Sequence, residues 1–140
     1  MFSDIFDAHT KLKNKDVSSV ELTKECLKNL GNNPNNSFIS ITTDLALDQA
    51  EKADQDISKN GLKNYLHGIP YSLKDLFITQ NIRTTAGSKM LYNYIPPYEG
   101  YVSRRLKEAG GILIGKNGCD EFGMGSSNDN TCLLYTSDAA

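Results

Sequence analysis

The longest apolar run of the chain reads Ile69-Pro70-Tyr71-Ser72-Leu73-Lys74-Asp75-Leu76-Phe77-Ile78, and two adjacent charges, Lys74 and Asp75, interrupt it. Two neighbouring charges are costly to bury. Either the element therefore ends at Lys74, or one charge is held inside for a reason. Desolvation lowers the pKa of a buried lysine, which can then act as a general base. From the pattern alone, the preferred interpretation is a Lys-Asp pair on the surface at the end of a strand.

The residues around this run predict an α/β fold. Residues 71–76 are expected to form a strand, residues 100–109 a helix, and residues 112–114 a second, fully apolar strand. A strand, a helix and a strand at this spacing make a β-α-β unit. A fully apolar strand is typical of a sheet that is covered on both faces. We therefore expect a parallel or mixed sheet with helices on both faces.

The first 61 residues predict a mainly helical cover for that sheet. Ser18 and Glu21 form a capping-box pattern at the start of a helix, and Gly31 suits its end. The inner face of a later helix is rich in alanine, which favours close packing against a neighbour. The expected elements are helices at residues 3–13, 18–30 and 44–59 and a strand at residues 37–42. This region carries no constellation of catalytic groups.

The composition of the chain excludes several classes of protein. Its 140 residues suffice for one domain, and its formal net charge of −2 gives no basic footprint for direct nucleic-acid binding. Three widely spaced cysteines indicate a reducing compartment, and they form no zinc pattern. No apolar run approaches the roughly 20 residues of a membrane span. The N-terminus also lacks the features of a secretory signal.

Several local patterns suggest chemistry, but each has a plainer interpretation. Residues 110–116 match the G-x-x-x-x-G-K skeleton of a phosphate-binding loop, yet Asn117 follows the lysine and the intervening residues resemble a strand. His67 has no partner at a useful spacing and is expected to face solvent or to bond locally. Asp120-Glu121 is a candidate metal or acid–base pair, and Ser126-Ser127 a candidate nucleophile on a turn. Neither has a supporting pattern, so we expect no metal site and a polar loop.

The order of the sequence pieces within residues 68–130 points to a family. These pieces are Gly68-Ile69-Pro70 with Lys74-Asp75, Thr84-Thr85 with Ser88-Lys89-Met90-Leu91, Pro97-Tyr98, Arg105-Leu106 with Glu108-Ala109-Gly110, Gly115-Lys116, and Asp120-Glu121-Phe122 with Met124-Gly125-Ser126-Ser127. With this order and spacing, the stretch resembles the first part of the amidase signature family. The runs at residues 88–90 and 120–127 make it most similar to the A subunits of glutamyl-tRNA(Gln) amidotransferases.

The resemblance implies roles for four residues. Lys74 matches the catalytic lysine of the family's Ser–cis-Ser–Lys triad, in which a neutral lysine relays a proton through a bridging serine. The second serine attacks the amide carbon, forms an acyl-enzyme and releases ammonia. Met124, Gly125 and Ser126 match a segment near the substrate pocket. Both family serines lie downstream of the matching stretch, so this chain is expected to lack them and to be inactive.

The resemblance also implies a substrate and partners. The parent protein would hydrolyse glutamine and supply ammonia for the conversion of Glu-tRNA(Gln) to Gln-tRNA(Gln). Its partners would be a B subunit, which binds the tRNA and uses ATP and Mg, and a small C subunit. The tRNA would therefore be reached only through the complex, and no cofactor would bind this chain. The protein would be cytoplasmic, or in an organellar matrix if eukaryotic.

The resemblance also sets the expected boundaries. Residues 1–130 would be the N-terminal part of an amidase-signature domain, with 1–61 as helical cover and 62–130 as the start of the catalytic α/β core. Residues 131–140 no longer look like the family and are interpreted as an unrelated tail. Two alternatives stay open: a hydrolase of another small or aryl amide, and a non-catalytic fragment or binding module. A cooperative melt would support a self-sufficient module, and a molten chain a truncated sheet with unpaired edges.

Overall fold

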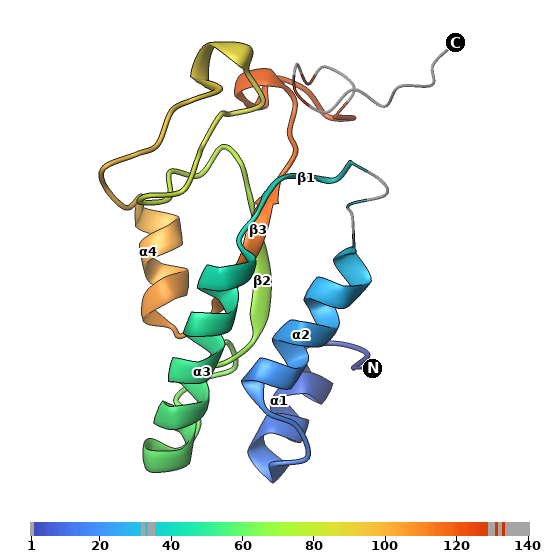
Figure 1. The fold of residues 1–140 in the computed structure, drawn as a ribbon, viewed down its shortest axis with the longest axis vertical. Coiled ribbons are helices and arrows are strands. Elements are labelled where there is room, and N and C mark those ends of the chain that lie inside the picture. The colour runs from blue at the N-terminus through green and yellow to red at the C-terminus, as the bar shows by residue number, and fades with distance from the viewer. Residues whose placement is uncertain (1, 32, 34–35, 129–130, 132, 134–140) are drawn as a thin grey trace. The chain divides into compact units, whose positions relative to one another are not determined.

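The computed structural model describes residues 2–31, 33, 36–128, 131 and 133. The helices are α1 (Ile5–Asn14), α2 (Ser19–Leu30), α3 (Thr43–Asn60) and α4 (Tyr101–Glu108), and the strands are β1 (Phe38–Ile41), β2 (Pro70–Lys74) and β3 (Ile112–Asn117) (Figure 1). Short 3-10 helices occur at Lys89–Leu91 and Glu121–Gly123. Each predicted helix and strand is present, although β3 runs beyond the predicted residues 112–114. The predicted tail lies outside the described residues, except for Thr131 and Leu133.

The three strands form one mixed sheet in the order β1-β3-β2, so β3 lies in the middle (Figure 1). β1 runs antiparallel to β3, with Ser40 opposite Lys116. β2 and β3 run parallel, because their hydrogen bonds advance in the same direction along both strands. The Ile112 N–H donates to the Ile69 carbonyl at 2.9 Å, and the Asp75 N–H donates to the Asn117 carbonyl at 2.9 Å. The predicted α/β class with a mixed sheet is confirmed.

The chain divides into two compact units. Unit 1 comprises residues 1–31, 42–71 and 105–114, and unit 2 comprises residues 32–41, 72–104 and 115–140. Lys74 and residues 124–126, the candidate site residues named above, all belong to unit 2. The predicted division at residues 61 and 62 follows secondary-structure content rather than compactness, and it stays a prediction.

Unit 1 is held together by helices that pack small and branched apolar side chains. The capping box is present, because Ser18 accepts from the Glu21 N–H and Glu21 accepts from the Ser18 N–H. The alanine-rich face of α3 packs on Ile112 of β3, in agreement with the expected packing against a neighbour. Its buried members are Ala46, Ala50 and Ala53. Alanine has no side chain beyond Cβ, so this face allows close approach.

His67 is buried, so of the two expectations, facing solvent or bonding locally, the first is wrong and the second agrees with the structure. Its Nδ1 accepts a hydrogen bond from the Lys63 N–H at 3.3 Å, and its Nε2 lies 3.2 Å from Asp56 Oδ2. The sequence spacing hid this acidic partner, because Asp56 lies on the preceding helix and is brought close only by the fold. Burial lowers the pKa of His67, and Asp56 opposes that shift. The histidine therefore serves unit 1 as a locally bonded structural residue.

Across the part of the chain that is described, none of the helices has the length and apolar character needed to cross a membrane.

Candidate functional site

The end of β2 places the two charges of the apolar run in opposite environments. Lys74 is exposed, whereas Asp75 is completely buried. Lys74 is the last residue of β2, and Asp75 is the first residue of the turn that follows. The expectation of a surface pair is therefore right for Lys74 and wrong for Asp75. The strand does end at Lys74, and the charge held inside is the carboxylate.

The Asp75 carboxylate has partners on two other segments of unit 2. Its Oδ1 lies 3.3 Å from Nζ of Lys116, and both side chains are 0% exposed. Its Oδ2 accepts a hydrogen bond from the Thr85 N–H at 2.8 Å and a second bond from the Thr85 hydroxyl. A buried charge is tolerated only when it is paired and hydrogen-bonded. Asp75 meets both conditions.

Lys116 on β3 is the buried cation of this site. Its Nζ donates to the Phe77 carbonyl at 2.9 Å and to Thr84 Oγ1 at 3.0 Å, in addition to its contact with Asp75. The ammonium group therefore makes two hydrogen bonds and one ion contact. Burial lowers the pKa of the Lys116 amine, and Asp75 acts in the opposite direction.

The G-x-x-x-x-G-K pattern at residues 110–116 does not form a phosphate-binding loop. Gly115 and Lys116 belong to β3, so this segment is a strand and not a phosphate-binding loop. Sequence reasoning considered Lys116 within that loop pattern and as part of the Gly115-Lys116 piece of the family resemblance, and it missed the buried ion pair with Asp75. The available signal was a lysine two residues after the apolar run 112–114, in a chain with an aspartate inside another apolar run.

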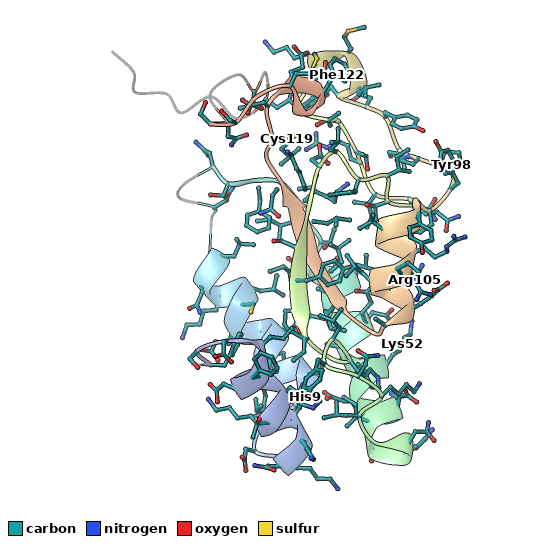
Figure 2. The ribbon with its side chains drawn as sticks, turned by 180° about the vertical axis from the view of Figure 1, so that it is seen from behind. His9, Lys52, Tyr98, Arg105, Cys119 and Phe122 are labelled. Carbon is teal, nitrogen blue, oxygen red and sulfur yellow. The ribbon has the colours of Figure 1, made fainter. Side chains whose placement is uncertain are left out.

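Residues 84–88 form a buried, irregular segment that links β2 to the residues after β3. The Ala86 N–H donates to the Asp75 carbonyl at 3.2 Å, and the Ala86 carbonyl accepts from the Phe122 N–H at 2.8 Å. The Ser88 hydroxyl donates to Glu121 Oε1 at 2.6 Å. Figure 2 labels Cys119 and Phe122 on the segment that follows β3. One short segment thus contacts both the end of β2 and this following segment.

Asp120 and Glu121 have structural partners, which favours the plainer interpretation of this pair. Asp120 is buried and its Oδ2 accepts from the Asn128 N–H at 3.0 Å, while Glu121 accepts from Ser88. Within the described ranges, no group of three or more His, Cys, Asp or Glu residues could hold a metal ion.

Residues 124–126 follow the 3-10 helix at Glu121–Gly123 and are exposed. Gly125 packs so closely on the Asp120 carboxylate that a Cβ at this position would overlap it. Among the described residues, no hydrogen bond or ion pair joins Lys74 to Met124, Gly125 or Ser126. The connection between the two candidate regions runs instead through residues 84–88.

Gly87 should be the position in this segment that tolerates a side chain least. Its φ is +70°, and an added Cβ would overlap the Cys119 carbonyl oxygen. Gly123 has φ +72°, but an added Cβ there would meet only the Leu76 side chain, with Cδ2 at 3.1 Å, which can move. Both Gly→Ala changes should cost about 1–2 kcal/mol from left-handed backbone strain. Gly87→Ala should cost at least about 1 kcal/mol more from overpacking. Urea unfolding of both variants tests this, and equal losses would contradict the close approach.

Comparison with known proteins identifies similar chains. The family model described as Amidase matches residues 21–139. The A subunit of glutamyl-tRNA(Gln) amidotransferase from Geobacter sulfurreducens is 46% identical over 134 residues, which cover 94% of this chain and 27% of that protein. Native peptide amidase from Stenotrophomonas maltophilia has a TM-score of 0.78 at 28% identity, covering 86% of this chain and 25% of that one. The corresponding A subunit from Thermotoga maritima has a TM-score of 0.63 at 28% identity, covering 83% and 23%. This chain therefore spans about a quarter of the length of the relatives it matches.

Proposed function

This chain belongs to the amidase family, and on that basis we propose that it is the lysine-bearing part of a glutamine-hydrolysing A subunit. The full protein would release ammonia for the conversion of Glu-tRNA(Gln) to Gln-tRNA(Gln). The observation that carries this proposal is the 46% identity to an A subunit over nearly the whole chain. Lys74 would act from the end of β2, next to the buried and hydrogen-bonded Asp75.

Lys74 is the proposed base of the reaction. In the neutral form it accepts a proton through a bridging serine, so that a second serine attacks the glutamine side-chain amide carbon. Ammonia leaves with a returned proton, and water then hydrolyses the acyl-enzyme to glutamate. Lys74 is exposed in this chain, whereas desolvation is what favours the neutral form of a lysine. Further residues that desolvate it and supply the serines are therefore required, and we expect the 140-residue chain alone to be inactive.

Residues 124–126 are the proposed substrate-contacting segment. Met124 is 76% exposed and so offers an apolar surface to a ligand. Gly125 and Ser126 are also exposed, and their backbone amides and the Ser126 hydroxyl suit the polar groups of glutamine. No metal or cofactor is needed on this chain for the proposed step.

The proposed partners follow the same assignment. A B subunit would bind the tRNA and use ATP and Mg, and a C subunit would complete the complex. The net charge of −2 supports contact with tRNA only through the complex, because strong phosphate binding needs a basic surface. The proposed location is the cytoplasm, or an organellar matrix in a eukaryote.

A chimera provides the test of this function. Residues 17–128 of this chain would replace the matching segment of the Geobacter sulfurreducens A subunit, expressed with that protein's own partner subunits. We expect ammonia release from glutamine and formation of Gln-tRNA(Gln), and no ammonia release from the 140-residue chain alone. A folded chimera without glutaminase activity would contradict the proposed function. Turnover of glutamine by the isolated chain would contradict the requirement for further residues.

Hydrolysis of other amides is a second candidate function, favoured by one structural observation. The peptide amidase has a higher TM-score to this chain than the Thermotoga protein, 0.78 against 0.63. Both structures are 28% identical in sequence to this chain, so sequence identity to them does not separate the two activities. Testing the chimera on a peptide carboxamide and on glutamine would decide between them, because the preferred substrate should show the higher kcat/KM.

A further inference from the structure

We propose that Asp75 is the positioning residue for Lys74, acting through its buried contacts with Thr85 and Lys116. The inference rests on the proposed catalytic role of Lys74. It assigns a function to a buried ion pair that the reaction itself does not use. Asp75 would not touch the substrate, and its effect would be to fix the strand end from which Lys74 extends.

The main chain on both sides of Asp75 is bonded to other segments. The Asp75 N–H donates to the Asn117 carbonyl at 2.9 Å, and its carbonyl accepts from the Ala86 N–H at 3.2 Å. The Lys74 carbonyl accepts from the Phe77 N–H at 3.0 Å. These bonds define the direction in which the chain leaves β2. Since side-chain direction follows from backbone direction, they also determine where Lys74 extends.

The carboxylate of Asp75 adds contacts that the main chain alone cannot provide. Oδ2 binds the N–H and the hydroxyl of Thr85, and Oδ1 faces Lys116 on β3. The Thr85 hydroxyl also accepts from the Gly87 N–H at 3.2 Å. The carboxylate therefore holds the start of the 84–88 segment against the end of β2. Charged hydrogen bonds of this kind are short and directional, which suits a positioning role.

The same segment also contacts the residues that lead to the proposed substrate region. The Phe122 N–H donates to the Ala86 carbonyl at 2.8 Å, and Ser88 donates to Glu121 at 2.6 Å. Residues 124–126 follow directly along the chain. Asp75 thus stands at one end of a series of hydrogen bonds that connects the strand end bearing Lys74 to this region. Loosening it should misalign the base and the substrate without removing any group that binds substrate.

The test compares Asp75→Asn, Thr85→Val and Thr85→Ser in the active chimera. Asp75→Asn and Thr85→Val should each lower kcat about 10²-fold, since a misplacement near 1 Å can have that effect. KM should change less than about threefold, because substrate contacts remain. Thr85→Ser keeps the hydroxyl and should retain kcat within about threefold of the parent chimera, at the same fraction folded.

The outcomes separate positioning from folding and from the proposed function. Loss of kcat in Thr85→Val with recovery in Thr85→Ser, at matched circular dichroism and melting behaviour, supports the proposal. If kcat falls only in proportion to the fraction of folded protein, the proposal is overturned. Equal loss of kcat in Thr85→Ser and Thr85→Val also overturns it. If Asp75→Asn does not fold, the comparison of Thr85→Val with Thr85→Ser still tests the proposal, because neither change alters a charge. Full activity of Lys74→Ala would overturn the proposed function itself, and it would do so whatever the Thr85 variants show.

Discussion

Lys74→Ala should lower glutamine turnover by the active chimera about 10²–10⁴-fold in kcat, which is the contribution expected of a positioned general base. Lys74→Arg should be equally inactive. An arginine keeps the positive charge and the length of the side chain, but it does not give up its proton at any pH that proteins tolerate. Equal loss in both variants would identify proton transfer, rather than charge, as the role of Lys74. Ammonia release at saturating glutamine gives the measurement.

The control for this prediction is Lys52, another exposed lysine of the chain, labelled in Figure 2. Lys52 lies on α3 and pairs with Asp48 one helical turn away, so Lys52→Ala removes only a surface ion pair. Such pairs are worth about 0.3–0.5 kcal/mol, and activity should be unchanged. Activity of Lys74→Arg close to that of the parent chimera would contradict the role of Lys74 as a base.

Local and periodic signals were sufficient to predict most of the fold. The capping box at Ser18 and Glu21 depends on residues three apart, and the inner face of α3 repeats with the period of a helix. The β-α-β unit follows from the order of its elements and from the usual connections between them. These features need no knowledge of distant contacts, so the sequence alone could supply them.

The charges that define the candidate site could not be predicted in the same way. Asp75 and Lys116 are 41 residues apart, and their contact depends on the register of two neighbouring strands and on the fold of residues 84–88. The contact between Asp56 and His67 could not be predicted from the sequence either, because it forms only when the end of α3 lies next to His67. The proposed role of Lys74 came from family resemblance. Its exposure and the burial of its neighbour came from the structure.

Lys116→Met should be the most destabilising of the substitutions considered for the 140-residue chain. It leaves the Asp75 carboxylate buried, and Oδ1 has no well-aligned hydrogen bond among the described residues besides its ion contact with Lys116. Removal of one partner of a buried ion pair costs about 3–5 kcal/mol. The double variant Asp75→Asn with Lys116→Met should recover most of this loss, because it removes the uncompensated charge. Urea unfolding supplies the free energies, and Lys52→Met is the control that should change little.

The pH dependence of stability gives an independent check on the same pair. Burial holds the pKa of Lys116 in the folded chain below 10.5, so between these two pKa values the unfolded chain binds more protons than the folded chain. The contribution of Lys116 to stability therefore rises with pH across this window. Compared with the double variant, the wild-type chain should gain stability as the pH is raised towards 10.5, the ordinary pKa of a lysine. Glu99, which also acts on the pKa of Lys116, is present in both proteins. The comparison is made with Cys119→Ser in both, because Asp75 raises and Lys116 lowers the pKa of the Cys119 thiol. The difference in unfolding free energy between the wild-type chain and the double variant is the measured quantity. If it stays constant with pH, or shifts in favour of the double variant, the lowered pKa of Lys116 and its burial are contradicted.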